Sequence, residues 1–114
     1  MKGVTLDDVR QIAIELPRTT EHLMRGDVTK FKVKQLVYAA VGPTEEVMGV
    51  AFPKLERAAM VESEPQKFTM PSQGDLRYNW IHVYMAEIDE AELRELVVEG
   101  WRMCVPKFIS ALVP

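Results

Sequence analysis

Few side chains in this sequence could act as a nucleophile, a base or a metal ligand. A thiol nucleophile needs a neighbouring base, and the only such pairing joins the single Cys104 to His22 or His82. The two histidines lie far apart in the sequence and form no HExxH or HxH spacing, which argues against a zinc site. Cys104 lies on an apolar stripe between Trp101 and Phe108, where we expect a small packed hydrophobic side chain rather than a reactive thiol. We therefore expect no catalytic residue, no metal and no cofactor, and a protein that is not an enzyme.

Phosphate contacts are better supported than catalysis, although the scattered glycines form neither GxGxxG nor GxxxxGK. In VTKFKVK, Lys30, Lys32 and Lys34 point to one side of a predicted strand, while Phe31 and Val33 point to the other. Neighbouring like charges are unfavourable unless water or an anion matches them, so this row could contact phosphates. The alternative is an edge strand that its lysines protect from aggregation. The candidate nucleic-acid-binding residues are Arg25, Lys30, Lys32, Lys34, Arg77 and Lys107.

An aromatic row marks a second candidate surface, in the segment YNWIHVYM. Its members alternate along one face of a predicted strand: Tyr78, Trp80, His82 and Tyr84. If the intervening apolar residues face the helices, the row lies on the open side of the sheet, where it could stack on bases or bury a partner. The alternative is that Trp80 covers a minor core beneath a loop.

The elements that position these residues can be read from periodicity and capping. Thr5 and Asp8 form the start of a helix from about Leu6 to Leu16, which Pro17 ends. The stretch RTTEHLMRGD reads as a polar connector. Three strands then follow in VTKFKVK, QLVYAAV and VMGVAF, as a meander.

The second half begins with a short amphipathic helix after Pro53, which brings Leu55 to its apolar side. A short strand around residues 67–70 and the YNWIHVYM strand follow. Asp89 then caps a long helix, with Glu92 completing its capping box, and Pro106 interrupts it. This order predicts a two-layer α+β fold, an antiparallel sheet of four to five strands with helices mainly on one face.

Length and charge limit the classes of protein. The 114 residues suit one domain, 1–114, and the formal net charge of −3 argues against strong undirected attraction to nucleic acid. Basic residues nevertheless outnumber acidic ones between Arg18 and Lys34, so a basic patch is compatible with the acidic total. No apolar run approaches a membrane span and no signal sequence is visible, so we expect a cytoplasmic protein without membrane contact.

The chain resembles the MmcQ/YjbR family of small bacterial proteins over nearly its whole length. The shared features, in order, are LDDVRQIAIELP, then Phe31, Val33 and Ala39, then Trp80 with Val83, and a closing helix in which Pro106 and Lys107 follow Trp101. The loop TTEHLMRGD departs from the glycine- and aromatic-rich segment common in that family, and the hairpin at Lys34 and Gln35 lacks the usual glycine. The resemblance implies an antiparallel sheet with helices, similar to secretion chaperones, and DNA binding through a double-wing arrangement.

Two functions remain open from the sequence. The first is a non-enzymatic DNA-binding domain that contacts phosphates through the basic hairpin, while Trp80 or Tyr84 adds stacking. The second is a protein-interaction or chaperone-like module, homodimeric, that uses the aromatic sheet face.

Overall fold

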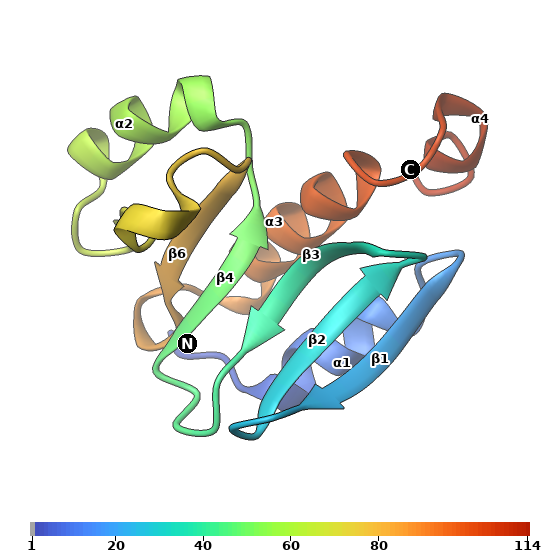
Figure 1. Ribbon diagram of the computed structural model, residues 1–114, viewed down its shortest axis with the longest axis horizontal. Coiled ribbons are helices and arrows are strands. Elements are labelled where there is room, and N and C mark those ends of the chain that lie inside the picture. The colour runs from blue at the N-terminus through green and yellow to red at the C-terminus, as the bar shows by residue number, and fades with distance from the viewer. Residues whose placement is uncertain (1) are drawn as a thin grey trace.

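The strands form one sheet in the order β1-β2-β3-β4-β6-β5, and every pairing in it is antiparallel. The computed structural model describes residues 2–114 (Figure 1). It confirms the α+β class, with six strands rather than four to five. In chain order the helices and strands are α1 (Leu6–Ala13), β1 (Thr19–Met24), β2 (Val28–Val33), β3 (Leu36–Val41), β4 (Val47–Ala51), α2 (Lys54–Ser63), β5 (Phe68–Thr69), β6 (Trp80–Tyr84), α3 (Glu90–Arg102) and α4 (Lys107–Ser110).

Helices α1 and α3 pack on one face of the sheet, behind it in Figure 1, and leave most of the other face open, with the segment between β5 and β6 lying in front of β6. The apolar side chains that alternate along β2, β4 and β6 point toward these helices. The core between sheet and helices includes Phe31 and Val50 from the sheet and Trp101 from α3, each at most 1% exposed. Burial of this layer is the main stabilising contribution to the fold. The other side of the sheet is therefore where polar and aromatic side chains can meet a ligand.

Strand β1 was wrongly expected to be part of a polar connector. Its residues show no apolar alternation, since five of the six are exposed, and the sequence therefore carries no burial signal. The strand forms because β2 offers a free edge and full pairing from Thr19 with Val33 to Met24 with Val28. Its consequence is that β1, and not the lysine-bearing β2, forms this edge of the sheet.

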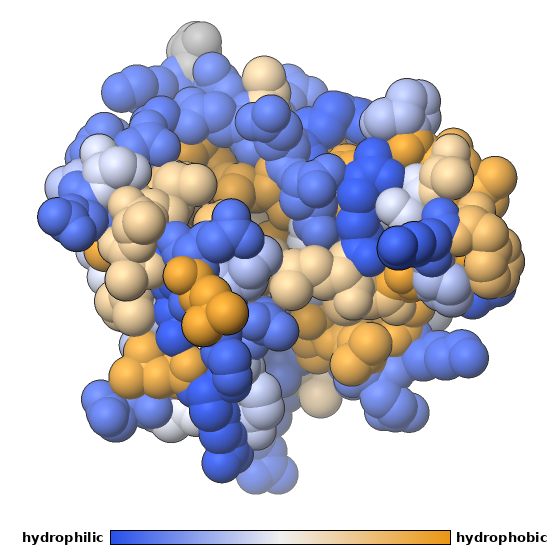
Figure 2. Space-filling model, turned by 90° about the horizontal axis from the view of Figure 1, so that it is seen from above, coloured by the Kyte–Doolittle hydropathy of each residue, from blue (hydrophilic) through white to orange (hydrophobic). Residues whose placement is uncertain are grey.

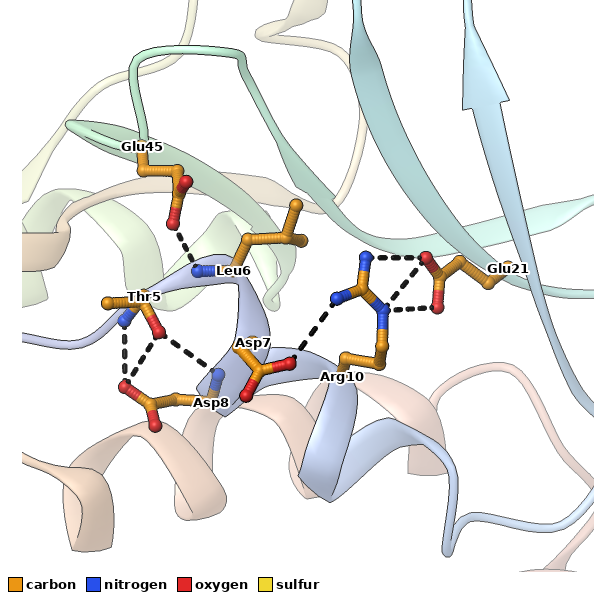
Figure 3. Close-up of polar contacts among 7 residues, drawn as sticks. All are labelled: Thr5, Leu6, Asp7, Asp8, Arg10, Glu21 and Glu45. Atoms are coloured by element: carbon orange, nitrogen blue, oxygen red, sulfur yellow. Dashed lines mark hydrogen bonds and ion pairs between the residues drawn. The ribbon is translucent and has the colours of Figure 1, made fainter.

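The start of α1 is fixed by the predicted capping box (Figure 3). The Asp8 backbone N–H donates to the Thr5 hydroxyl at 3.2 Å, and the Asp8 carboxylate accepts from the Thr5 backbone N–H at 2.8 Å. Arg10 on the same helix forms an ion pair with Glu21 of β1 at 2.9 Å. The helix ends at Ala13, three residues before the predicted end at Leu16, and a turn brings Leu16 back into the core.

Helix α2 begins after Pro53 as predicted, but its burial is different from the prediction. Leu55 is 93% exposed, and the one buried residue of the helix is Arg57. The helix packs mainly on β5 and β6 at the margin of the sheet, where Met60 and Val61 lie partly buried against the core.

Helix α3 begins at the predicted cap, where the Asp89 carboxylate accepts from the Glu92 backbone N–H at 2.8 Å. The Glu92 side chain does not complete the capping box and instead pairs with Lys67 at 2.8 Å. After Pro106 the chain forms α4, whose orientation is fixed by Arg102: its guanidinium donates to the backbone oxygens of Ser110 and Val113. Within residues 2–114 no helix has the length and apolar character to cross a membrane.

Candidate functional site

One row of side chains crosses the open face of the sheet from edge to edge. Cross-strand partners point to the same face of a sheet. The printed register therefore aligns one residue from each strand in the row: His22, Lys30, Ala40, Gly49, His82 and Thr69. The basic side of the sheet and its aromatic side, which the sequence could only predict separately, thus share a single face.

A groove of about 690 Å³ lies on this face. Strands β3 and β4 pair only from Ala39 to Val41, so they separate toward the start of β3, and the end of α3 fills part of the opening. One side of the groove comes from the β2–β3 hairpin, the opposite side from the segment before β6, and its end from the residues after α3. The groove-lining side chains that can contact a ligand include Lys30, Gln35, Val37, Asp75, Tyr78, Asn79, Trp80 and Cys104.

The position of Trp80 depends on a glycine. Its indole ring lies over Gly49 so closely that a Cβ on that residue would clash with ring atoms Cζ2, Cε2 and Nε1. Trp80 is partly buried and lines the groove together with Ala40 and Ala51. Small side chains on β3 and β4 therefore make room for the ring, which extends from β6 toward the basic side of the sheet.

The cations on β2 lie on the open face without a carboxylate partner. No ion pair in residues 2–114 involves Arg25, Lys30, Lys32 or Lys34. The nearby Glu21 points to the helix face, where Arg10 binds it. Within residues 2–114, no ion pair with a carboxylate therefore offsets the charge of Lys30 or Lys32 on the open face.

Two parts of the lysine hypothesis need correction. Lys34 is not on the strand, because β2 ends at Val33 and Lys34 occupies the following turn with φ of 55°. The edge-strand explanation is wrong for β2, since this strand lies between β1 and β3. Arg25 lies in the turn between β1 and β2, at the other end of the same strand from Lys34.

The aromatic row is only partly available to a partner. Tyr78 precedes the strand, is 52% exposed and stacks under the Arg77 guanidinium at 4.8 Å. Tyr84 is 37% exposed at the other end of β6. His82 is half-buried, and this burial lowers its pKa, while the charge of Asp75 opposes the shift. The exposed surface of the row thus concentrates at its two ends and along the groove side of Trp80.

Arg57 holds the aromatic end of the groove, and the sequence analysis did not identify it. Its buried guanidinium donates to three backbone oxygens: those of Leu76 at 2.7 Å, Tyr78 at 3.0 Å and Trp80 at 2.8 Å. A buried arginine with no carboxylate partner must satisfy its donors on carbonyl groups. The sequence feature that could have indicated this role is an arginine inside a short helix whose apolar face is weak.

The remaining candidate residues either lie outside the groove, as Arg77 and Lys107 do, or are not activated for catalysis, as with Cys104. Arg77 is on the segment before β6, where its guanidinium donates to the Tyr78 hydroxyl at 2.8 Å. Lys107 lies on α4, beside Phe108, whose ring is 5.8 Å from the Arg18 guanidinium carbon. Burial raises the pKa of the Cys104 thiol, which disfavours the thiolate. In the described residues 2–114, no three His, Cys, Asp or Glu side chains lie close enough to hold a metal ion.

Figure 2 views the molecule from the end at which α2 and α4 lie. Apolar residues gather on the side of α4 and reach toward the middle of the view, and a second group lies on the side of α2, with hydrophilic residues between the two. Phe108 and Leu112 are 68% and 66% exposed, so the chain end after α3 contributes to the apolar surface.

Two comparisons with known proteins give matches, one to a family model and one to a solved structure. A family model described as YjbR matches residues 14–103. A crystal structure of the Deinococcus radiodurans protein DR2400, described with the domain DUF419, has the same fold with a TM-score of 0.76 and 18% sequence identity. The match covers 91% of this chain and 80% of that one. A search of curated proteins gives no match.

Proposed function

The chain belongs to the YjbR family, as the sequence resemblance predicted, and we propose that it is a non-enzymatic DNA-binding domain of the cytoplasm. The open face of the sheet is its binding surface. The observation that carries the proposal is the unpaired charge of Lys30 and Lys32 on the same face as Trp80. Phosphate groups neutralise such cations, and release of the counterions around DNA favours the complex.

The phosphate contacts and the base contacts would come from different strands of the sheet. Lys30 and Lys32 on β2, with Arg25 and Lys34 in the turns at its two ends, would bind phosphates in succession. Trp80 and Tyr84 on β6 would contact bases. Arg77 and Lys107 lie at the margins and would add charge without defining the path. A surface with cations on one side and aromatic rings on the other suits a strand that presents phosphates and bases to different sides.

The test is a titration with single-stranded and duplex DNA at two salt concentrations. We expect affinity to rise as salt falls. In the variant Lys30→Gln/Lys32→Gln, the slope of log K against log salt should become less steep by about 2, roughly one unit for each lost phosphate contact. Arg94→Gln is the matched control, since Arg94 lies on α3, on the other side of the sheet. Absence of binding at low salt would refute the proposal.

A protein-interaction role is the second candidate, in which the same aromatic face joins two copies of the chain. The exposed Tyr78 and Tyr84, at 52% and 37%, favour it because aromatic side chains contribute strongly to interfaces. Sedimentation analysis at increasing concentration would test it. Self-association that Trp80→Ala abolishes would support this candidate, and a monomer at all concentrations would exclude it.

A further inference from the structure

The groove beside Trp80 has the features of a site for one unpaired nucleotide. We propose that it takes a single base of a single-stranded DNA, stacked on Trp80, with the adjoining phosphate at Lys30. This inference rests on the proposed DNA-binding function and names the substrate class. The groove volume of about 690 Å³ lies within the range of small-ligand sites, about 300–1,000 Å³.

The geometry of the row across the sheet sets the distance between the two contacts. The indole lies over Gly49 on β4, and Lys30 is two strands away in the same row. Two strands correspond to about 10 Å at the usual spacing. The ammonium group of Lys30 is carried on a flexible four-carbon stem, so it can extend from β2 toward the indole ring. One nucleotide can therefore contact Trp80 with its base and Lys30 with its phosphate.

The charges along the groove orient the nucleotide. Lys30 lies on one side and Asp75 lies on the other. A phosphate is attracted to the first and repelled by the second. The base therefore lies toward the aromatic side, which Trp80 and Tyr78 line, and the phosphate lies toward β2.

Polar groups near Trp80 can contact the edge of the base. The Oδ1 of Asn79 accepts from the Lys54 backbone N–H at 3.0 Å, which directs the two N–H groups of the amide elsewhere. One carboxylate oxygen of Asp75 accepts from the Ser72 hydroxyl at 3.2 Å, and the other has no partner in residues 2–114. One donor group and one acceptor therefore remain for an unpaired base.

Duplex DNA cannot use this groove, because its bases are stacked and paired inside the helix. A duplex would contact only the cations of β2 and its turns. The site therefore predicts a preference for single strands. Stacking on an aromatic side chain accounts for a difference of roughly 5- to 150-fold for one base.

The experiment uses the wild-type chain with four probes. Three have the same length: oligothymidylate, its duplex with oligodeoxyadenylate, and an abasic strand with the same phosphates. The fourth is thymidine monophosphate. Two signals report on the groove. Quenching of Trp80 fluorescence reports stacking, because the other tryptophan, Trp101, is 0% exposed. Protection of Cys104 from alkylation reports occupancy, because Cys104 lines the groove.

We expect oligothymidylate to quench Trp80, to slow alkylation of Cys104 and to bind roughly 5- to 150-fold more tightly than the abasic strand. Equal binding of the duplex or the abasic strand, without either signal, overturns the inference and leaves DNA binding through the lysines intact. Equal affinity for thymidine monophosphate also overturns it, since the groove would then be a mononucleotide site. If no probe binds at low salt, the proposed function itself fails.

A variant adds a test that does not depend on these signals. Trp80→Phe keeps an aromatic ring with a smaller stacking surface, and it should lower the ratio of oligothymidylate to abasic affinity while the salt slope is unchanged. A ratio that Trp80→Phe does not alter contradicts the stacking contact.

Discussion

The indole ring of Trp80 lies directly over the backbone of Gly49, with β6 supplying the ring and β4 the space. No side chain larger than hydrogen can occupy position 49 while the ring remains there. The contact extends the aromatic side of the open face toward Lys30, which lies in the same row of the sheet as Gly49. One glycine therefore determines how close the aromatic and basic sides approach.

The variant Gly49→Ala should displace the Trp80 ring. Its new methyl group would overlap ring atoms, and overpacking of this kind costs about 1–3 kcal/mol of unfolding free energy. Urea unfolding measures this loss, and acrylamide quenching measures the exposure of Trp80. Gly74→Ala is the matched control, because a Cβ there meets nothing within 4 Å, and its effect should stay within about 0.5 kcal/mol. Equal stability of both variants would contradict the packing described.

The variant Arg57→Met should release the segment before β6. Three backbone oxygens lose a charged donor, and such hydrogen bonds contribute about 1.5–3 kcal/mol each, so we expect a loss of at least about 2 kcal/mol. Limited proteolysis should cut residues 70–79 faster than in the wild type. Arg94→Met removes an exposed arginine whose ion pair with Glu15 contributes about 0–1 kcal/mol. If both variants lose the same stability, Arg57 has no special role.

Stability should fall as the solution becomes acidic, with His82 as one cause. Burial lowers the pKa of this histidine below its ordinary value of 6.5, so below 6.5 the unfolded chain binds the proton more readily than the folded chain. The contribution of neutral His82 to the free energy of unfolding is complete above pH 6.5 and is lost as the pH decreases below that value. Unfolding curves between about pH 7.5 and about pH 5.5 measure it. His82→Asn should show a smaller decrease than the wild type, and an unchanged decrease would assign the effect to other groups.

The thiol of Cys104 should react slowly with alkylating reagents in the folded protein. Burial raises its pKa, which leaves less thiolate near neutral pH, and the residue is only partly accessible. The rate measured with iodoacetamide should be well below that of the urea-unfolded chain. A folded rate equal to the unfolded rate would indicate an accessible, activated thiol and would reopen the question of covalent chemistry.

The sequence predicted the elements that carry a burial signal. Thr5 and Asp8 identified the start of α1, and Asp89 identified the start of α3, because capping uses side chains within one turn of the helix. The alternation of Lys30 and Lys32 with apolar neighbours identified the open side of β2. Strand β1 was missed because an edge strand with exposed side chains has no such alternation.

The sequence by itself determined the helix starts and the residue types on each strand face, because these depend on neighbours within a few positions, and the order of such elements along the chain indicated the fold class and the family. Only the tertiary structure decided that β2 is an interior strand, that Trp80 rests on Gly49, and that Arg57 holds the segment beside it. These relations join segments far apart in the chain. Strand order and register set them, and the free energy that selects an order belongs to the packed sheet rather than to any one strand.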